Sequence, residues 1–284
     1  MWRHWFVQGD NMGYQIVFTD IDGTLLNGKQ RILDSTLYAI EQLQAQGIPL
    51  VPVTARGPFC VDPILERYGL RCPMICYSGA AILDEDHKVI QSLGLSREIA
   101  VEIIDYIEDH HWPCVWNVYT MDQWIVKDRS DARVALEESI VEVDAIEGSM
   151  DLVKETDVIG KLLCMCEESD TDAIETGLKE KYPQLSIVRS SDILIEIMDR
   201  GISKGQGIRT FCKGLGVKTE DTVAFGDHYN DVDMLETVGM PFLMENAPKE
   251  LKKRIKNVTL SNEDGGIYDG LYRLGLIHNP YLHA

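Results

Sequence analysis

The chain has 284 residues, of which 27 are Lys or Arg and 46 are Asp or Glu, so its formal net charge at pH 7 is −19. This charge repels a nucleic-acid backbone or an anionic membrane surface at long range, and we expect neither as a partner. A phosphorylated small molecule stays compatible with it, provided that local cations or a metal ion offset the repulsion. The length allows one large domain or two unequal ones, and we expect two.

The cysteines and the N-terminal residues indicate where the protein works. The seven cysteines lack the spacing of a zinc site, and the closest pair, Cys164 and Cys166, alternates with Met165 in a strand-like run. We interpret them as buried free thiols and predict a cytoplasmic location. No apolar stretch approaches the ~18 residues of a membrane span. Residues 1–13 lack the apolar core of a signal peptide, and we interpret them as an N-terminal extension.

The first predicted strand, residues 15–19, is followed directly by Asp20, Asp22 and Gly23. Side chains alternate along a strand, so the two carboxylates project from one face, and glycine allows a sharp turn beside them. Two acids that face one point indicate a hard divalent cation and acid–base chemistry. The alternative is a turn whose acids are only solvated.

Two other sites with paired acids are excluded. A calcium loop of the EF-hand type that starts at Asp20 needs Gly and Glu where this chain has Leu25 and Arg31. An aspartic protease needs two carboxylates that share a proton, and the segment has no second copy.

Helical and strand patterns then alternate. Residues 35–46 have the periodicity of a helix that ends at Gly47, and further apolar runs lie at residues 48–53, 72–77, 222–225 and 240–244. Nearly continuous apolar runs separated by helices are typical of parallel strands that are buried on both faces. The sequence therefore predicts an open parallel sheet.

The middle of the chain, residues 84–199, has a different pattern, and we predict that it forms an inserted domain. Helical patterns lie at residues 99–107 and 171–181, and strand-like runs lie at residues 124–127, 161–166, 185–189 and 193–197. We expect a mixed sheet with helices on one face. Trp112, Trp116 and Trp124 would suit a platform for a sugar or a flavin, but aromatic residues at strand spacing are more typical of a core.

Polar residues follow the ends of separate predicted strands. Asp20, Thr54 and Asp227 each stand directly after one of them. In an open parallel sheet, ligands bind beyond the carboxyl ends of the strands, so these residues can share one crevice.

Two more segments can contribute to that crevice. Lys204 begins a predicted helix, residues 204–213, where free N–H groups and the helix dipole favour an anion. A phosphate contact is one interpretation of this lysine, and an ordinary surface residue is the other. The turn at residues 226–231 contains Asp227, Asn230 and Asp231, a composition that needs a cation or hydrogen bonds to offset its charge. It is a candidate metal site.

Together these segments resemble the four motifs of the haloacid dehalogenase superfamily. Residues 20–26, Thr54, Lys204 and residues 226–231 match those motifs in order, and the resemblance covers most of residues 14–277. An insertion between the second and third motifs, with residues 203–205 and 246–248 downstream, resembles the Cof-type phosphatases of subfamily IIB. Ser78-Gly79 replaces a frequent Asn-Gly, and residues 55–57 replace Gly-Arg-Pro; these departures concern substrate contacts.

The resemblance implies an α/β fold with a doubly wound, Rossmann-like parallel core, residues 14–83 and 200–284, and an inserted α+β cap domain, residues 84–199. It implies a magnesium-dependent phosphatase that hydrolyses a small phosphorylated metabolite, such as a sugar phosphate, through an aspartyl-phosphate. The alternatives are a phosphotransferase or sugar phosphomutase, and a silent phosphate-binding regulatory protein.

The resemblance also implies a role for each matching residue. Asp20 is the expected nucleophile, and Asp22 the expected general acid and base. Mg²⁺ would be held by Asp20, Asp227 and the backbone carbonyl of Asp22, and Asp231 would orient these ligands. The expected phosphate and substrate contacts are Thr54, Arg56, Lys204 and Asn230, with a surface position as the alternative for Arg56. The oligomeric state is not predicted.

Overall fold

The computed structural model describes residues 13–278, which form two compact units. The core unit comprises the described residues up to Ala55, then Cys72–Lys88, and those from Ser203 onward; the cap unit comprises Arg56–Arg71 and Val89–Ile202. Of the predicted N-terminal extension, all but Gly13 lies outside the described residues. None of the helices between residues 13 and 278 is both long enough and apolar enough to cross a membrane.

The core unit is built on a parallel sheet, as predicted. Its strands, in the order β13-β12-β1-β2, are Met240–Leu243, Thr222–Gly226, Ile16–Thr19 and Leu50–Pro52. All neighbouring pairs are parallel. A further parallel bridge between Val53 and Ile75 places β3 (Met74–Cys76) beside β2, and β3 pairs in antiparallel fashion with β4 (Ala81–Leu83).

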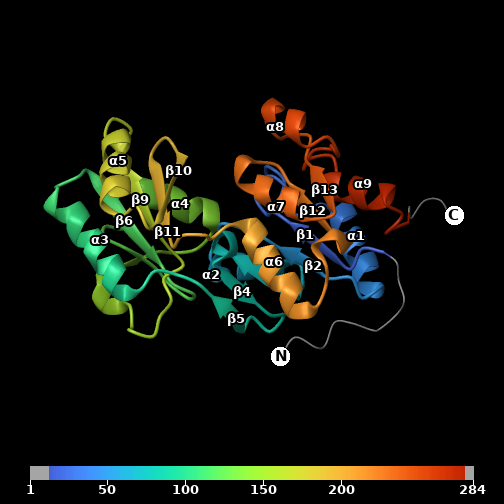
Figure 1. Cartoon of the computed structure of the whole chain (residues 1–284), viewed down its shortest axis with the longest axis horizontal. Helices are drawn as coiled ribbons and strands as arrows, with labels where there is room; N and C mark the ends of the chain where they lie inside the picture. Colours follow the sequence, from blue (N-terminus) through green and yellow to red (C-terminus); the bar gives the residue numbers. More distant parts are fainter. Residues whose placement is uncertain (1–12, 279–284) are drawn as a thin grey trace. The chain divides into compact units, whose positions relative to one another are not determined.

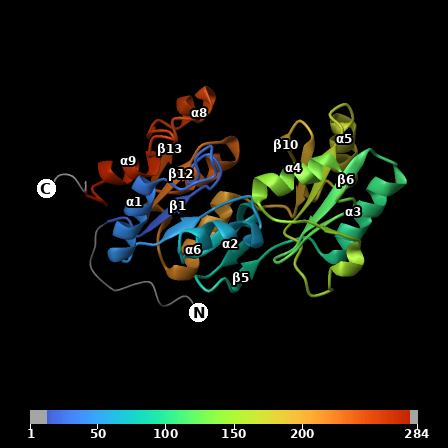
Figure 2. The ribbon, with the colours of Figure 1, turned by 180° about the vertical axis from the view of Figure 1, so that it is seen from behind.

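Helices cover both faces of this sheet (Figure 1; Figure 2). The helices of the core unit are α1 (Asp34–Ala45), α6 (Lys204–Leu215), α7 (Val232–Thr237), α8 (Lys249–Arg254) and α9 (Gly266–Arg273). Phe18 pairs with Ala224 in the sheet, so Phe18 and Phe225 point to opposite faces. The Phe18 ring packs on Phe211 of α6, whereas Phe225 lies against Gly270 of α9. This two-sided packing confirms the doubly wound core.

The cap unit contains a six-stranded mixed sheet in the order β10-β11-β9-β6-β7-β8. The strands are Ser186–Ser191, Leu194–Met198, Lys161–Cys166, Cys114–Tyr119, Trp124–Val126 and Ile146–Glu147. The short strand β5, Val89–Ser92, is not part of this six-stranded sheet; it is the third strand of the sheet β3-β4-β5. The helices are α2 (Pro58–Arg67), α3 (Arg97–Asp109), α4 (Ala132–Val141) and α5 (Thr171–Lys181). The pattern in the sequence did not indicate α2, α4 or β6.

One face of the cap sheet packs on α3 and α5, which confirms the expected α+β arrangement. Ile103 and Ile174 from these helices share a buried cluster with Cys164 of β9 and Ile195 of β11. Trp116 and Trp124 are buried, with 6% and 1% of their surface exposed, so the interpretation of these two rings as core is correct. All seven cysteines are buried and free, as predicted.

Candidate active site

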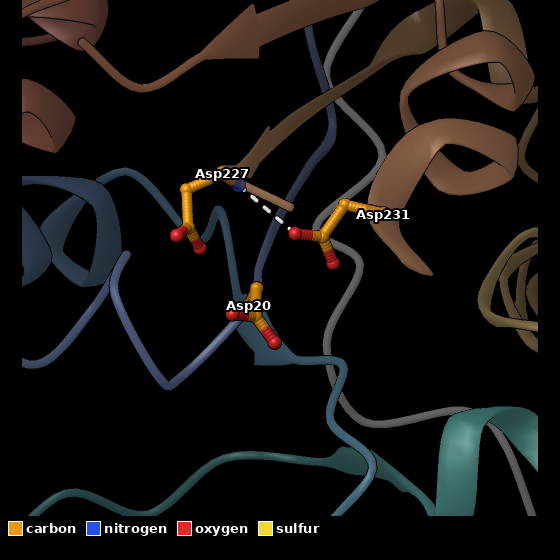
Figure 3. Close-up of side chains that lie close together, drawn as sticks. All are labelled: Asp20, Asp227 and Asp231. Carbon is orange, nitrogen blue, oxygen red and sulfur yellow. Dashed lines mark hydrogen bonds between the residues drawn. The ribbon is translucent and has the colours of Figure 1, made fainter. Parts of the chain in front are cut away.

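The carboxyl ends of β1 and β12 bring the first and fourth motifs together. Thr19 is the sheet partner of Phe225, so Asp20 and Asp227 leave the same edge of the sheet from neighbouring strands. Asp231 follows in a short 3₁₀ turn, Tyr229–Asp231, that leads into α7. Figure 3 shows the three carboxylates turned toward a common point. One oxygen of each lies within 4.8 Å of one oxygen of the other two.

The turn itself orients Asp231. The Oδ2 atom of Asp231 accepts hydrogen bonds from the backbone N–H groups of Asp227 (2.9 Å, dashed in Figure 3) and His228 (3.0 Å). Its other oxygen accepts a bond from Lys204. Asp231 is completely buried, and these bonds satisfy a carboxylate that would otherwise be strongly disfavoured there.

Lys204 is the buried cation of the site. It is the first residue of α6, only 1% of its surface is exposed, and its Nζ donates to Oδ1 of Asp20 at 2.5 Å and to Oδ1 of Asp231 at 2.6 Å. The alternative of an ordinary surface lysine is therefore wrong. Burial acts to lower the pKa of Lys204, but the two carboxylates outweigh it and raise that pKa above its usual value. The ammonium group therefore stays charged.

For the carboxylates of Asp20 and Asp227, in contrast, the surroundings disfavour the charged form. Burial and the charge of Asp231 raise the pKa of Asp20 well above its usual range, although Lys204 acts against them. The same two causes raise the pKa of Asp227 to about 6. In the ionised forms that metal binding requires, the three acids together with Lys204 would carry a net charge of −2. A divalent cation would neutralise it, and carboxylate oxygens are the ligands that hard divalent cations prefer. The residues of this chain fit such an ion.

Two further residues, Thr24 and Asn246, hold Asp227 in place. The Thr24 hydroxyl donates to Oδ1 of Asp227 at 2.9 Å, and the Asn246 amide donates to its Oδ2 at 3.2 Å and to the Gly23 carbonyl at 2.9 Å. Gly23 has a φ of 81°, and a Cβ there would overlap the Asp227 carboxylate, so glycine is required. Thr24 and Asn246 were not predicted as site residues. Both lie in segments that match the family motifs, residues 20–26 and 246–248, and this match could have identified them.

Of the other predicted site residues, Asp22, Thr54 and Asn230 follow the ends of β1, β2 and β12 in the core unit, whereas Arg56 belongs to the cap unit. Thr54 is buried directly beyond β2; its N–H donates to the Ile75 carbonyl and its own carbonyl accepts from Ser78. Asn230 is exposed in the turn before α7. Asp22 is exposed, and its side chain is not part of the three-carboxylate cluster. Arg56 is half-buried and belongs to the cap unit. The roles of these four residues stay predictions.

Comparison with known proteins agrees with this arrangement. Residues 17–271 match the model of a family described as haloacid dehalogenase-like hydrolases. A Haemophilus influenzae protein named "Putative phosphatase" is 34% identical over 90% of this chain and 96% of its own length.

Solved structures share the fold. A haloacid dehalogenase-like hydrolase from Bacteroides thetaiotaomicron has a TM-score of 0.84 at 23% identity, and the match covers 92% of this chain and 99% of that one. A sugar phosphatase of HAD subclass IIB has a TM-score of 0.76 at 22% identity, with 93% and 100% of the two chains covered. With the family match and the buried acidic site, these likenesses show that the chain belongs to the haloacid dehalogenase-like hydrolases and is a phosphatase of that family.

Proposed function

We propose that the protein is a magnesium-dependent phosphatase that hydrolyses a small phosphorylated metabolite through an aspartyl-phosphate on Asp20. The observation that carries this proposal is the pairing of the Asp20 carboxylate with a buried Lys204, beside Asp227 and Asp231. An anionic nucleophile can approach an anionic ester only where positive charge offsets the repulsion between them. Mg²⁺, held by Asp20, Asp227 and the Asp22 carbonyl with Asp231 behind them, would supply the rest of that charge.

The residues of the chain divide the reaction into two steps. An Asp20 oxygen attacks phosphorus in line, the ester P–O bond breaks, and Asp22 gives a proton to the leaving oxygen. Water then attacks phosphorus, Asp22 takes its proton, and inorganic phosphate leaves with Asp20 regenerated. Lys204, Thr54, Arg56 and Asn230 are the proposed contacts of the phosphoryl oxygens and the substrate. Lys204 also keeps one Asp20 oxygen fixed, so that the other can face the ester.

The proposed substrate class is a sugar phosphate or a similar small ester. The solved relative that is a sugar phosphatase supports this class, and so does the negative net charge of the chain, which disfavours nucleic acids. The seven free thiols support the reducing cytoplasm as the place of action.

A phosphate-release screen tests this proposal. Purified protein is incubated with a panel of small phosphate esters, with Mg²⁺ or with chelator, beside Asp20→Asn and the matched surface variant Glu41→Gln. We expect the wild type to release inorganic phosphate with Mg²⁺ and without an added acceptor, and to lose this activity in chelator. Glu41→Gln should keep full activity, whereas the activity of Asp20→Asn should fall about 10³-fold or more. Consumption of the ester only in the presence of an acceptor, with the phosphoryl group transferred to that acceptor instead of released as inorganic phosphate, would favour a phosphotransferase. Release that does not depend on Asp20 would refute the nucleophile.

A further inference from the structure

A strained segment, Tyr77–Gly79, lies directly beyond β3 in the core unit. Tyr77, Ser78 and Gly79 have φ values of 49°, 53° and 108°, all in the left-handed region. This region is unfavourable for residues with a Cβ, and most of all for a bulky side chain such as tyrosine. Among the non-glycine residues of positive φ within residues 13–278, Tyr77 is the only buried one, with 0% of its surface exposed. Such strain persists only where the surroundings hold it in place.

The surroundings of this segment are parts of the candidate active site. The Ser78 N–H donates to the Thr54 carbonyl at 2.8 Å. A Cβ at Gly79 would overlap the carbonyl oxygen of Ser203, the residue before Lys204. The segment is therefore clamped between the end of β2 and the start of α6, which are the two places that carry Thr54 and Lys204.

The side chain of Ser78 takes no part in the hydrogen bonds that hold this turn. It is half-buried, and within the described part of the chain its hydroxyl makes no hydrogen bond. Glycine would accept this backbone conformation without strain. The serine therefore adds one feature that the turn does not need, a free hydroxyl beside Thr54.

The order of the strands decides what that hydroxyl can reach. Asp20 follows β1, Thr54 follows β2, and Ser78 follows β3, the next strand along the same edge. Neighbouring strands lie about 4.8 Å apart, so Ser78 is displaced by about 10 Å from Asp20. A phosphorus atom poised for attack lies within about 3.5 Å of the nucleophile. The backbone of Ser78 is thus farther from the attacking carboxylate than that of Thr54, on the side where the organic part of an ester can lie.

We propose that Ser78 is a specificity residue of this phosphatase, whose hydroxyl forms a hydrogen bond with a polar group on the organic part of the substrate. The inference rests on the proposed phosphatase function and narrows its substrates to esters of hydroxylated compounds, such as polyol and sugar phosphates. The strained backbone of residues 77–79 holds the hydroxyl at the edge of the site.

The test compares two kinds of ester with Ser78→Ala, which removes only the hydroxyl. The hydroxylated esters are glycerol 3-phosphate, ribose 5-phosphate and glucose 6-phosphate, and phenyl phosphate serves as the ester whose organic part forms no hydrogen bond. We expect kcat/KM for the best hydroxylated ester to fall about 5- to 20-fold, the effect of one lost hydrogen bond, while the value for phenyl phosphate stays within about twofold. The half-buried Ser35→Ala on α1 is the matched control and should change neither.

Two more variants separate substrate contact from backbone effects. Ser78→Gly also lacks the hydroxyl but relieves the strain, so it should show the same selective loss with a raised melting temperature. Ser78→Asn restores a polar group in a residue that tolerates the left-handed conformation and should recover part of the selectivity. Equal effects on both kinds of ester, or none on either, would overturn the assignment of Ser78 alone. A wild-type protein that releases phosphate from no ester would overturn the phosphatase proposal, and this inference with it.

Discussion

Replacing Asp227 with Asn should stabilise the metal-free protein while abolishing its response to Mg²⁺. Burial and Asp231 raise the pKa of Asp227 to about 6 from its usual 3.8, so the ionised carboxylate is disfavoured in the folded state. A shift of about 2 units corresponds to about 3 kcal/mol at neutral pH. Asparagine keeps an acceptor for the Thr24 hydroxyl but cannot accept from the Asn246 amide. The loss of that hydrogen bond lowers the stability of the variant by about 1 kcal/mol. We expect a net gain of about 2 kcal/mol in chelator.

The effect of Asp227→Asn on the free energy of unfolding should depend on pH. Because the folded-state pKa of Asp227 is raised, the group favours the folded state at pH values below its usual pKa, and this contribution is lost as the pH rises through about 6. The stability of Asp227→Asn relative to wild type should therefore increase as the pH rises from about 4 to above 6, from slightly below wild type to about 2 kcal/mol above it. Saturating Mg²⁺ should reverse the order, because an ion at 100 times its dissociation constant adds about 2.7 kcal/mol to the wild type alone.

Urea unfolding followed by circular dichroism measures both effects. The experiment is run in chelator across this pH range and again with Mg²⁺ at neutral pH, with Glu41→Gln, an exposed acid on α1, as the control for removal of one negative charge. An Asp227→Asn protein that is less stable than wild type in chelator at neutral pH would refute the electrostatic reasoning. A difference that does not vary with pH would refute it as well.

Other substitutions test separate parts of the structure. Lys204→Met should lower the free energy of unfolding by about 3–5 kcal/mol, because it leaves two buried carboxylates without their cation, and urea unfolding will measure it. A loss below about 1 kcal/mol would mean that Lys204 is solvated. Gly79→Ala should lower the melting temperature by several degrees, since its Cβ would overlap the Ser203 carbonyl; an unchanged scan would contradict that contact. The thiol of Cys72, whose pKa burial raises to about 12, should react with a thiol reagent only on unfolding, and rapid labelling of the native protein would contradict its burial.

The sheet and the acidic edge could be predicted because their signals are local. The apolar run at residues 15–19 and the acid that follows it identify both a buried strand and the place where that strand ends. The same holds for residues 222–227. For parallel strands of an open sheet, the carboxyl ends meet at one edge, so the sequence alone was enough to place Asp20 and Asp227 together.

Other features depend on contacts between distant segments, which the sequence does not show. A lysine at the start of α6 has the same local pattern whether it is exposed or buried, and only the fold brings Asp20 and Asp231 onto it. Helix α2 was not predicted, because Pro58 and Pro63 are typical of turns. Pro58 in fact stands at the first position of the helix, where proline is tolerated. The left-handed backbone of Tyr77 was equally unpredictable, because an apolar residue there continues the pattern of a strand.

The most direct test of the account is to trap phosphate on the nucleophile. The protein is mixed with a radiolabelled phosphate ester and Mg²⁺, quenched rapidly in acid, digested, and searched for labelled peptides. We expect label on the peptide that contains Asp20, loss of that label in Asp20→Asn, and its disappearance on a chase with unlabelled ester. Label on another residue, or turnover without any labelled peptide, would contradict the claim that Asp20 attacks phosphorus.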